Sequence, residues 1–226
     1  MAEILYHGSE NIIEKPEYGR GAKNNDYGRG FYCTRSGELA KEWACKNNND
    51  GFVNTYEIDM AGLNIIDLNG EGFHILNWLA VLAENRTYWQ SGSIAAEAKE
   101  YIKKEFMPDI SGADIMIGNR ADDSYFSFAQ DFVSGAISLG KLSKAMHLGE
   151  LGEQVVLISP EAFERIRFKE SEKVKAEIYY PKKVGRDYSA RKEYRKSKKD
   201  AASLTDEIYM IDILREEIKN NDPRLL

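Results

Sequence analysis

The sequence has few of the residues that staple small or secreted proteins. Its 226 residues include two cysteines, five prolines and three histidines, so neither a disulfide framework nor a Cys/His zinc array is expected. There is no long apolar run, and 42% hydrophobic with 30% charged residues is an ordinary balance. This composition excludes disordered, collagen-like and membrane-spanning classes. The length is sufficient for one domain, or at most two, with a core of its own.

The first residues and the cysteines indicate a compartment. Residues 1–4 do not begin a leader peptide, and Cys33 and Cys45 are too few for a secreted disulfide scaffold. Reduced thiols are typical of a reducing environment. We therefore predict a cytoplasmic protein without a membrane partner.

Charge is unevenly distributed along the chain. Residues 182–199 contain nine Lys/Arg and two acidic residues, a local balance of +7, whereas the whole chain carries −6. A basic element on an acidic body indicates either a solvated helical face, which is the commoner case, or a contact with nucleic acid or an acidic protein.

Hydrophobic periodicity predicts an α+β protein, because strands flank a helical middle segment. The run of residues 154–159, ended by Pro160, is the clearest β run. Residues 38–44 form one apolar stripe of a helix that Ser36 or Gly37 can cap. The predicted strands are 4–9, 30–34, 52–59, 64–68, 114–118, 154–159 and 175–180. The predicted helices are 38–44, 72–86, 95–106, 125–134, 139–145, 160–166, 186–202 and 206–220.

Two segments carry residues suited to chemistry. In the first, His7 is followed by Gly8, which lets a ligand approach the backbone, and by the hydroxyl of Ser9. In the second, residues 26–34, Gly28 and Gly30 precede a strand that bears Tyr32, whose ring offers a flat face. This second segment fits neither a P-loop nor the G-x-G-x-x-G fingerprint. Taken alone, His7 is better explained as a structural histidine at a strand end, where a neighbour satisfies its ring.

Together these segments resemble the ADP-ribosyltransferase superfamily in its His-Tyr-Glu branch, which includes diphtheria toxin and the poly(ADP-ribose) polymerases. The fuller set of residues 5–9, 26–32, Ala121-Asp122-Asp123 and Gln154 is similar to an uncharacterised bacterial family assigned to that superfamily, over residues 4–168. The resemblance implies a split β core in a domain spanning residues 1–180, with a helical insert at about 72–106. Residues 181–226 would form a helical C-terminal extension.

The resemblance also implies roles for individual residues toward NAD, which is the substrate of such enzymes. His7 would bind the adenosine-side ribose, the backbone of Gly8 the nicotinamide carboxamide, and Ser9 would add a hydrogen bond. Tyr32 would line the nicotinamide pocket. Trp43 lies on the following helix, where it either stacks on the nicotinamide or belongs to the core.

The loop before Tyr32 contributes further candidates. Gly30 can bring the backbone close to a ligand, and Arg20 and Arg29 can meet the pyrophosphate or remain solvated charges. The role of Asp26 stays open in the same way.

The third member of the triad is usually a glutamate that opens a late strand, and here two residues compete for that position. Glu153 and Gln154 are adjacent, so only one of them faces the site. We expect Gln154, which can accept a hydrogen bond from a ribose hydroxyl but cannot act as a general base. If Glu153 faces inward, the usual triad is restored.

The function that the resemblance implies is mono-ADP-ribosyl transfer, a glycosyltransferase reaction, from NAD to a protein or nucleic-acid acceptor. Related bacterial transferases further suggest a toxin with an antitoxin partner. Two alternatives remain open. One is an inactive module that binds NAD, another nucleotide or a protein. The other is a nucleic-acid-binding protein that acts through residues 182–199.

Overall fold

The computed structural model describes residues 2–86, 93–121, 123–148, 152–199 and 207–225. Its strands are β1 (Ala2–Ser9), β2 (Phe31–Cys33), β3 (Gly51–Asp59), β4 (Ile65–Asp67), β5 (Ile115–Asn119), β6 (Glu153–Leu157) and β7 (Ile166–Val174). Its α-helices are α1 (Gly37–Ala44), α2 (Ile75–Asn85), α3 (Ser93–Phe106), α4 (Asp123–Val133), α5 (Leu139–Ala145), α6 (Pro160–Arg165), α7 (Ala176–Lys199) and α8 (Met210–Arg215). The protein is therefore α+β, as the sequence predicts.

The strands form two open sheets. One has the order β1-β3-β7 and is antiparallel; the other has the order β2-β6-β5-β4, in which only the pair β4 and β5 is parallel. A bridge between Tyr6 and Thr34 joins β1 to the end of β2 through two backbone hydrogen bonds of 2.8 and 2.9 Å. His7 on β1 and Tyr32 on β2 flank this bridge, so the junction between the sheets brings them close together.

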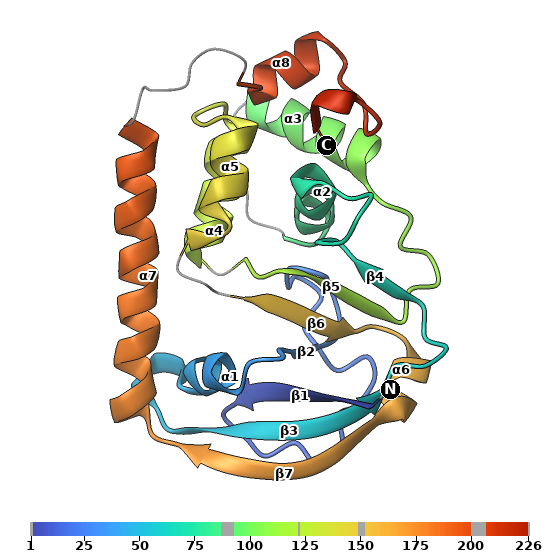
Figure 1. Ribbon diagram of the computed structural model, residues 1–226, viewed down its shortest axis with the longest axis vertical. Coiled ribbons are helices and arrows are strands. Elements are labelled where there is room, and N and C mark those ends of the chain that lie inside the picture. Colours follow the sequence, from blue (N-terminus) through green and yellow to red (C-terminus); the bar gives the residue numbers. More distant parts are fainter. Residues whose placement is uncertain (1, 87–92, 122, 149–151, 200–206, 226) are drawn as a thin grey trace.

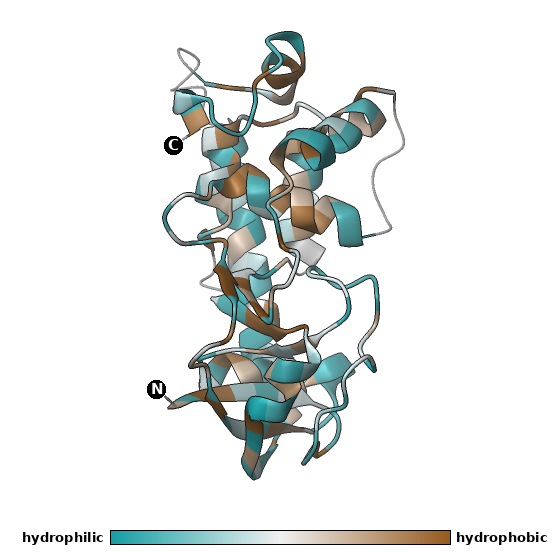
Figure 2. Cartoon of the chain, turned by 90° about the vertical axis from the view of Figure 1, so that its right-hand side faces the viewer, coloured by the Kyte–Doolittle hydropathy of each residue, from teal (hydrophilic) through white to brown (hydrophobic). Residues whose placement is uncertain are grey.

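The molecule is layered along its long axis. Figure 1 shows the two sheets in one half, the helices α2, α3, α4, α5 and α8 in the other, and α7 running beside both. Figure 2 shows hydrophobic positions on the central strands and on the inner faces of these helices. The largest core lies between the second sheet and the helical layer and includes Trp78, Phe106, Tyr125, Phe128 and Phe132. A second core fills the space between the two sheets.

The start of α7 corrects one prediction. The sequence predicts a strand at 175–180, but α7 begins at Ala176, and residues 166–174 form β7 instead. The backbone N–H of Ala176 donates to Asp50 Oδ1 at 3.0 Å, so a distant carboxylate caps the first turn of the helix. Ala176 and Val174 also pack on α1. A local pattern does not contain this tertiary cap, and β7 carries too few apolar residues to be recognised.

The C-terminal part also differs from the prediction. The helix expected at 186–202 begins ten residues earlier, and α8 is shorter than the expected 206–220. α7 runs through position 180, where the resemblance places a domain boundary that stays a prediction, and residues 200–206 lie outside the described part. Within the described residues, every helix is too short or too polar to cross a bilayer.

Candidate functional site

A cleft of about 1250 Å³ brings together most of the residues singled out in the sequence. Its lining includes His7, Gly8, Arg20, Gly30, Tyr32, Trp43 and Gln154. We call the part formed by β1, β2 and β6 the strand wall. The part formed by Tyr180, Lys183, Val184, Asp187 and Arg191 of α7 is the helix wall. Positions 7, 32 and 154 thus share one cleft, whereas Ser9 and Glu153 are not part of its lining.

His7 is held in a defined tautomer. Its Nδ1 lies 2.6 Å from the backbone oxygen of Tyr32, and its ring stacks on Phe31 with the centroids 4.4 Å apart. Because a carbonyl oxygen only accepts, Nδ1 carries the proton and donates it. Burial lowers the pKa of His7 below its ordinary value, which favours the neutral ring at pH 7. Nε2 of this ring is therefore a hydrogen-bond acceptor.

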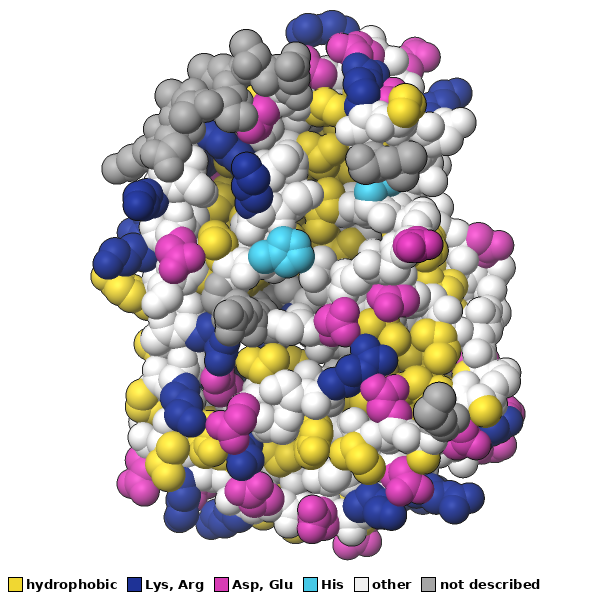
Figure 3. All heavy atoms as spheres, viewed as in Figure 1, with side chains coloured by type: hydrophobic (Ala, Val, Ile, Leu, Met, Phe, Trp, Pro, Cys, Tyr) yellow, Lys and Arg dark blue, Asp and Glu magenta, His cyan; other side chains and the backbone are white. Residues whose placement is uncertain are grey.

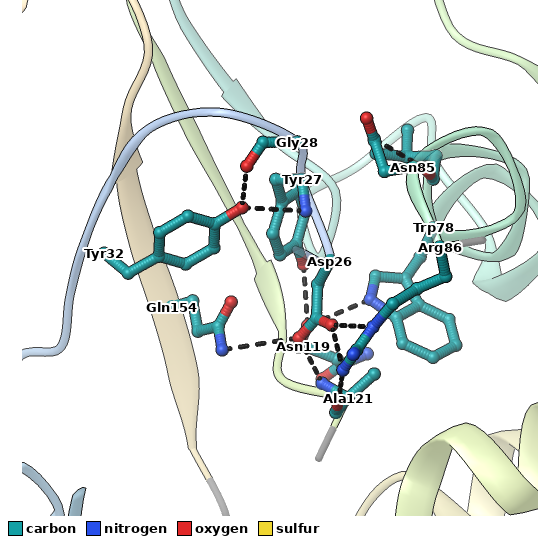
Figure 4. Close-up of polar contacts among 11 residues, drawn as sticks. Asp26, Tyr27, Gly28, Tyr32, Trp78, Asn85, Arg86, Asn119, Ala121 and Gln154 are labelled. Carbon is teal, nitrogen blue, oxygen red and sulfur yellow. Dashed lines mark hydrogen bonds and ion pairs between the residues drawn. The ribbon is translucent and has the colours of Figure 1, made fainter. Parts of the chain in front are cut away.

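The hydroxyl of Tyr32 is committed to the neighbouring loop. It donates to the backbone oxygen of Gly28 at 2.6 Å and accepts the N–H of Tyr27 at 3.1 Å (Figure 4). Burial also raises the pKa of Tyr32, so the phenol stays protonated. The hydroxyl of Tyr32 thus shapes the loop, which leaves its ring as the part available to the cleft that Tyr32 lines.

The glycines of the site are required by packing. A Cβ on Gly8 would collide with the backbone oxygen of Ala40 and lie 2.7 Å from the nitrogen of Ala44, both on α1. A Cβ on Gly30 would lie 2.6 Å from Val156 Cγ1. The space that these glycines leave is thus occupied by protein. Their backbone still lines the cleft, but the expectation that the missing side chain admits a ligand does not describe this geometry.

The two neighbours at the start of β6 point in opposite directions. Glu153 accepts from Arg35 Nη1 at 3.0 Å and from Asn69 Nδ2 at 2.9 Å, away from the cleft. Gln154 is 6% exposed and lines the cleft. Its Oε1 is buried without a hydrogen-bond partner, and its Nε2 lies 3.5 Å from Asp26 Oδ2. The inward residue is therefore the glutamine.

Asp26 is the centre of a buried polar cluster that Figure 4 shows beside Gln154. Its Oδ1 accepts from Nε and Nη2 of Arg86, both at 2.8 Å, and its Oδ2 accepts the N–H of Ala121 at 2.8 Å. Arg86 Nη2 also donates to the Ala121 oxygen at 2.6 Å. Burial raises the pKa of Asp26, while Arg86 and the Ala121 N–H oppose this effect.

The sequence left the role of Asp26 open and gave no sign of Arg86. Arg86 caps the end of α2, far from any recognisable motif. Only the position of Asp26, directly before the loop that leads to Tyr32, could have indicated that it belongs to the site. Asp122, part of the motif that carried the resemblance, lies outside the described residues.

Trp43, Arg20 and Ser9 have different settings. The Trp43 ring lies 4.3 Å from the Arg120 guanidinium, and its Nε1 is buried without a hydrogen-bond partner. The Arg20 side chain is 76% exposed at the rim and pairs with Glu17 at 3.1 Å. Ser9 Oγ donates to the Asn11 oxygen at 2.6 Å. Trp43 thus lines the cleft and keeps a buried donor without a partner, whereas the hydroxyl of Ser9 is already engaged.

The helix wall is anchored by the basic residues of α7. Arg186 binds both oxygens of the buried Glu42 at 3.0 and 2.8 Å, and Lys182 contacts Glu38 at 3.4 Å. Farther along the helix, Asp131 accepts from Tyr194 at 2.6 Å and from Lys198 at 2.9 Å. Figure 3 shows basic and acidic side chains interspersed along this edge. Several charges of the basic element therefore serve to dock α7 on the acidic body.

Comparison with known proteins places the chain in a family. No curated protein and no solved structure matches it. A family model matches residues 3–168, which include the whole strand wall and exclude α7. On this match, the chain belongs to the family described as "Protein of unknown function (DUF3990)".

Proposed function

We propose that this protein is a mono-ADP-ribosyltransferase that uses NAD as donor, releases nicotinamide and modifies a protein or nucleic-acid acceptor. The observation that carries the proposal is that His7, Tyr32 and Gln154, remote in sequence, line one cleft. The order of these residues resembles the His-Tyr-Glu branch of that superfamily. The two separate sheets on either side of the site are in keeping with its split β core.

The polar groups of the cleft suit a ligand rich in hydroxyls and phosphates. His7 Nε2 and Gln154 Oε1 are acceptors for ribose hydroxyls. Arg120 and Lys183 also line the cleft and are suited to the pyrophosphate. A typical small-molecule site measures about 300–1,000 Å³. The observed 1250 Å³ exceeds this range and so leaves space for part of an acceptor beside the donor.

The reaction breaks the bond between nicotinamide N1 and ribose C1′, and the bonding electrons leave with nicotinamide. A lone pair of the acceptor forms the new bond to C1′, and the acceptor loses its proton to water or to its own surroundings. Positive charge develops on the ribose, as in glycoside hydrolysis. Gln154 Oε1 is buried without a hydrogen-bond partner, and the negative end of the amide dipole, turned toward the ribose, would stabilise that charge.

The test is to incubate the purified protein with NAD, with and without cell extract. We expect release of free nicotinamide and incorporation of label from adenine-labelled NAD into acid-precipitable material. His7→Ala should reduce kcat/KM about 100-fold, the order seen when a positioned hydrogen-bonding group is removed.

His147 provides the matched control, because it is exposed and lies outside the lining of the cleft. His147→Ala should retain the wild-type rate. No nicotinamide release from the wild type, with or without extract, would contradict the proposal.

A second candidate is an NAD-binding module without turnover. It is favoured by the inward position of Gln154, since an amide cannot accept a proton as a general base. Calorimetry would then give NAD binding that His7→Ala weakens, while no nicotinamide appears. The toxin role, the antitoxin partner and the cytoplasmic location stay predictions from the sequence.

A further inference from the structure

The amide of Gln154 can be placed in two orientations of almost the same shape, but they present opposite chemistry to the cleft. One turns the carbonyl oxygen, an acceptor, toward the ligand; the other turns the NH₂ group, a donor. The difference therefore decides whether position 154 can bind a hydroxyl through its hydrogen. The neighbour that can select between them is Asp26, whose Oδ2 lies 3.5 Å from Nε2.

Asp26 cannot adapt to the other orientation. An ionised carboxylate only accepts hydrogen bonds, so the carbonyl end of the amide would face it oxygen to oxygen. The carboxylate is also held in place, because Arg86 donates to Oδ1 and the Ala121 N–H to Oδ2, each at 2.8 Å. Gln154 is nine-tenths buried, which strengthens this preference.

We propose that Asp26 is a positioning residue, which holds the NH₂ of Gln154 and so turns Oε1 of that amide into the cleft as a hydroxyl acceptor. The unpartnered, buried Oε1 is the observation that points to a ligand. The identity of that ligand as NAD rests on the proposed function, whereas the orientation of the amide does not.

The proposal can be tested through turnover by exchanging the carboxylate and the amide between positions 26 and 154. In Asp26→Asn, Arg86 retains the oxygen of the new amide, so its NH₂ replaces Oδ2 and faces Gln154, which favours the flipped orientation. The bond from the Ala121 N–H is lost in this variant and equally in the double variant below, so the comparison between the two is unaffected. We expect nicotinamide release to fall at least tenfold in kcat, with a smaller change in KM. In Asp26→Asn/Gln154→Glu, the introduced glutamate accepts from the NH₂ of the introduced asparagine and presents its other oxygen to the cleft.

If Asp26 had a merely structural role, the second substitution would not restore kcat. The double variant should recover at least tenfold in kcat over Asp26→Asn. Gln154→Glu alone, with two carboxylates side by side, should be slower than the double variant at neutral pH. If the double variant is no faster than Asp26→Asn, the proposal is overturned.

Asp114→Asn is the matched control for loss of a carboxylate. Asp114 accepts from Ser159 Oγ and the Asn64 N–H and does not line the cleft. Its variant should retain the wild-type kcat, and an equal loss there would assign the Asp26 effect to general instability.

A measurement without NAD separates this proposal from the proposed function. The side-chain ¹⁵N amide signal of Gln154, assigned by its absence in Gln154→Glu, should shift with pH in the wild type as Asp26 titrates. In Asp26→Asn the signal should move to a new position and lose this titration. Identical, pH-independent signals in both proteins would overturn the positioning role even if the enzyme turns over NAD. A wild type that shows the titration but no turnover would overturn only the proposed function.

Discussion

The strand wall and the helix wall of the cleft use their polar side chains differently. On the strand wall, Gln154 is oriented by buried neighbours and retains an acceptor without a partner. On α7, Arg186 and Lys198 turn to carboxylates of α1 and α4. Under our proposals the first arrangement prepares groups for a ligand, whereas the second attaches a helix to the body.

The family match also separates the strand wall from the helix wall. It covers the strand wall and ends before α7. Under the proposed function, the strand wall, which carries His7, Tyr32 and Gln154, would supply the chemistry of the site. The following predictions compare the two walls and the residues around them.

The largest expected effect is on stability at Gly8. Gly8→Ala places a methyl against the backbone of α1, a collision that a flexible side chain cannot relieve. We expect the free energy of unfolding to fall by about 3 kcal/mol in urea denaturation. Gly185, on the exposed face of α7, has nothing within 4 Å of its Cβ position. Gly185→Ala should instead stabilise by about 0.5–1 kcal/mol. A stable Gly8→Ala protein would show that α1 does not pack there.

The next effect tests the docking of α7. Arg186→Met leaves the buried Glu42 without its bidentate partner. Because Arg186 is partly exposed, we expect a loss of about 2–4 kcal/mol in the free energy of unfolding, measured by urea denaturation. Lys182→Ala removes a contact with the exposed Glu38 and should cost less than about 1 kcal/mol. Equal losses would mean that α7 is not held mainly at Glu42.

A smaller effect is expected on the pH dependence of nicotinamide release, through His7 on the strand wall. The pKa of His7 is lowered by burial, so its neutral form persists below pH 6.5 and is lost only as the pH falls through the lowered value. The kcat/KM of nicotinamide release should fall tenfold per pH unit below that point. The residual activity of His7→Ala should lack this limb. An acid limb retained in His7→Ala would assign it to another group.

The lowered pKa of His7 also makes the free energy of unfolding depend on pH, and it predicts lower stability at acid pH. The unfolded chain binds a proton at His7 near pH 6.5, while the folded protein resists it. The contribution of His7 is therefore present above that pH and is lost as the pH falls through the folded-state value. Urea midpoints of the wild type and His7→Ala should converge or cross as the pH is lowered.

The smallest effects are expected outside the cleft. Glu153→Gln alters contacts with Arg35 and Asn69, and Ser9→Ala removes a hydroxyl bound to Asn11. Each should change kcat/KM of nicotinamide release by less than about twofold, because neither side chain belongs to the lining. A tenfold loss in Glu153→Gln would instead place the glutamate in the site.

Much of the fold was predictable where local pattern and tertiary packing agree. The helix predicted at 139–145 is α5 without a shift, and the run at 154–159 is β6 within two residues. The start of α7 was predicted wrongly because its cap comes from Asp50, more than a hundred residues away. β7 was missed because its outward face is charged.

The site was predictable in part. Strand alternation limited the choice to Glu153 or Gln154, but only packing decides which of them faces inward. His7 and Tyr32 belonged to recognisable segments, whereas Arg86 stands at a helix end without a motif. The cluster around Asp26 is created by contacts between elements distant in the chain, which no spacing rule contains.

The most direct test of the account is a crystal structure of the protein with NAD. We expect one NAD in the cleft, with a hydroxyl of the nicotinamide ribose within hydrogen-bond distance of Gln154 Oε1 and the nicotinamide against the ring of Tyr32. NAD bound elsewhere, or a cleft that stays empty at saturating NAD, would contradict it.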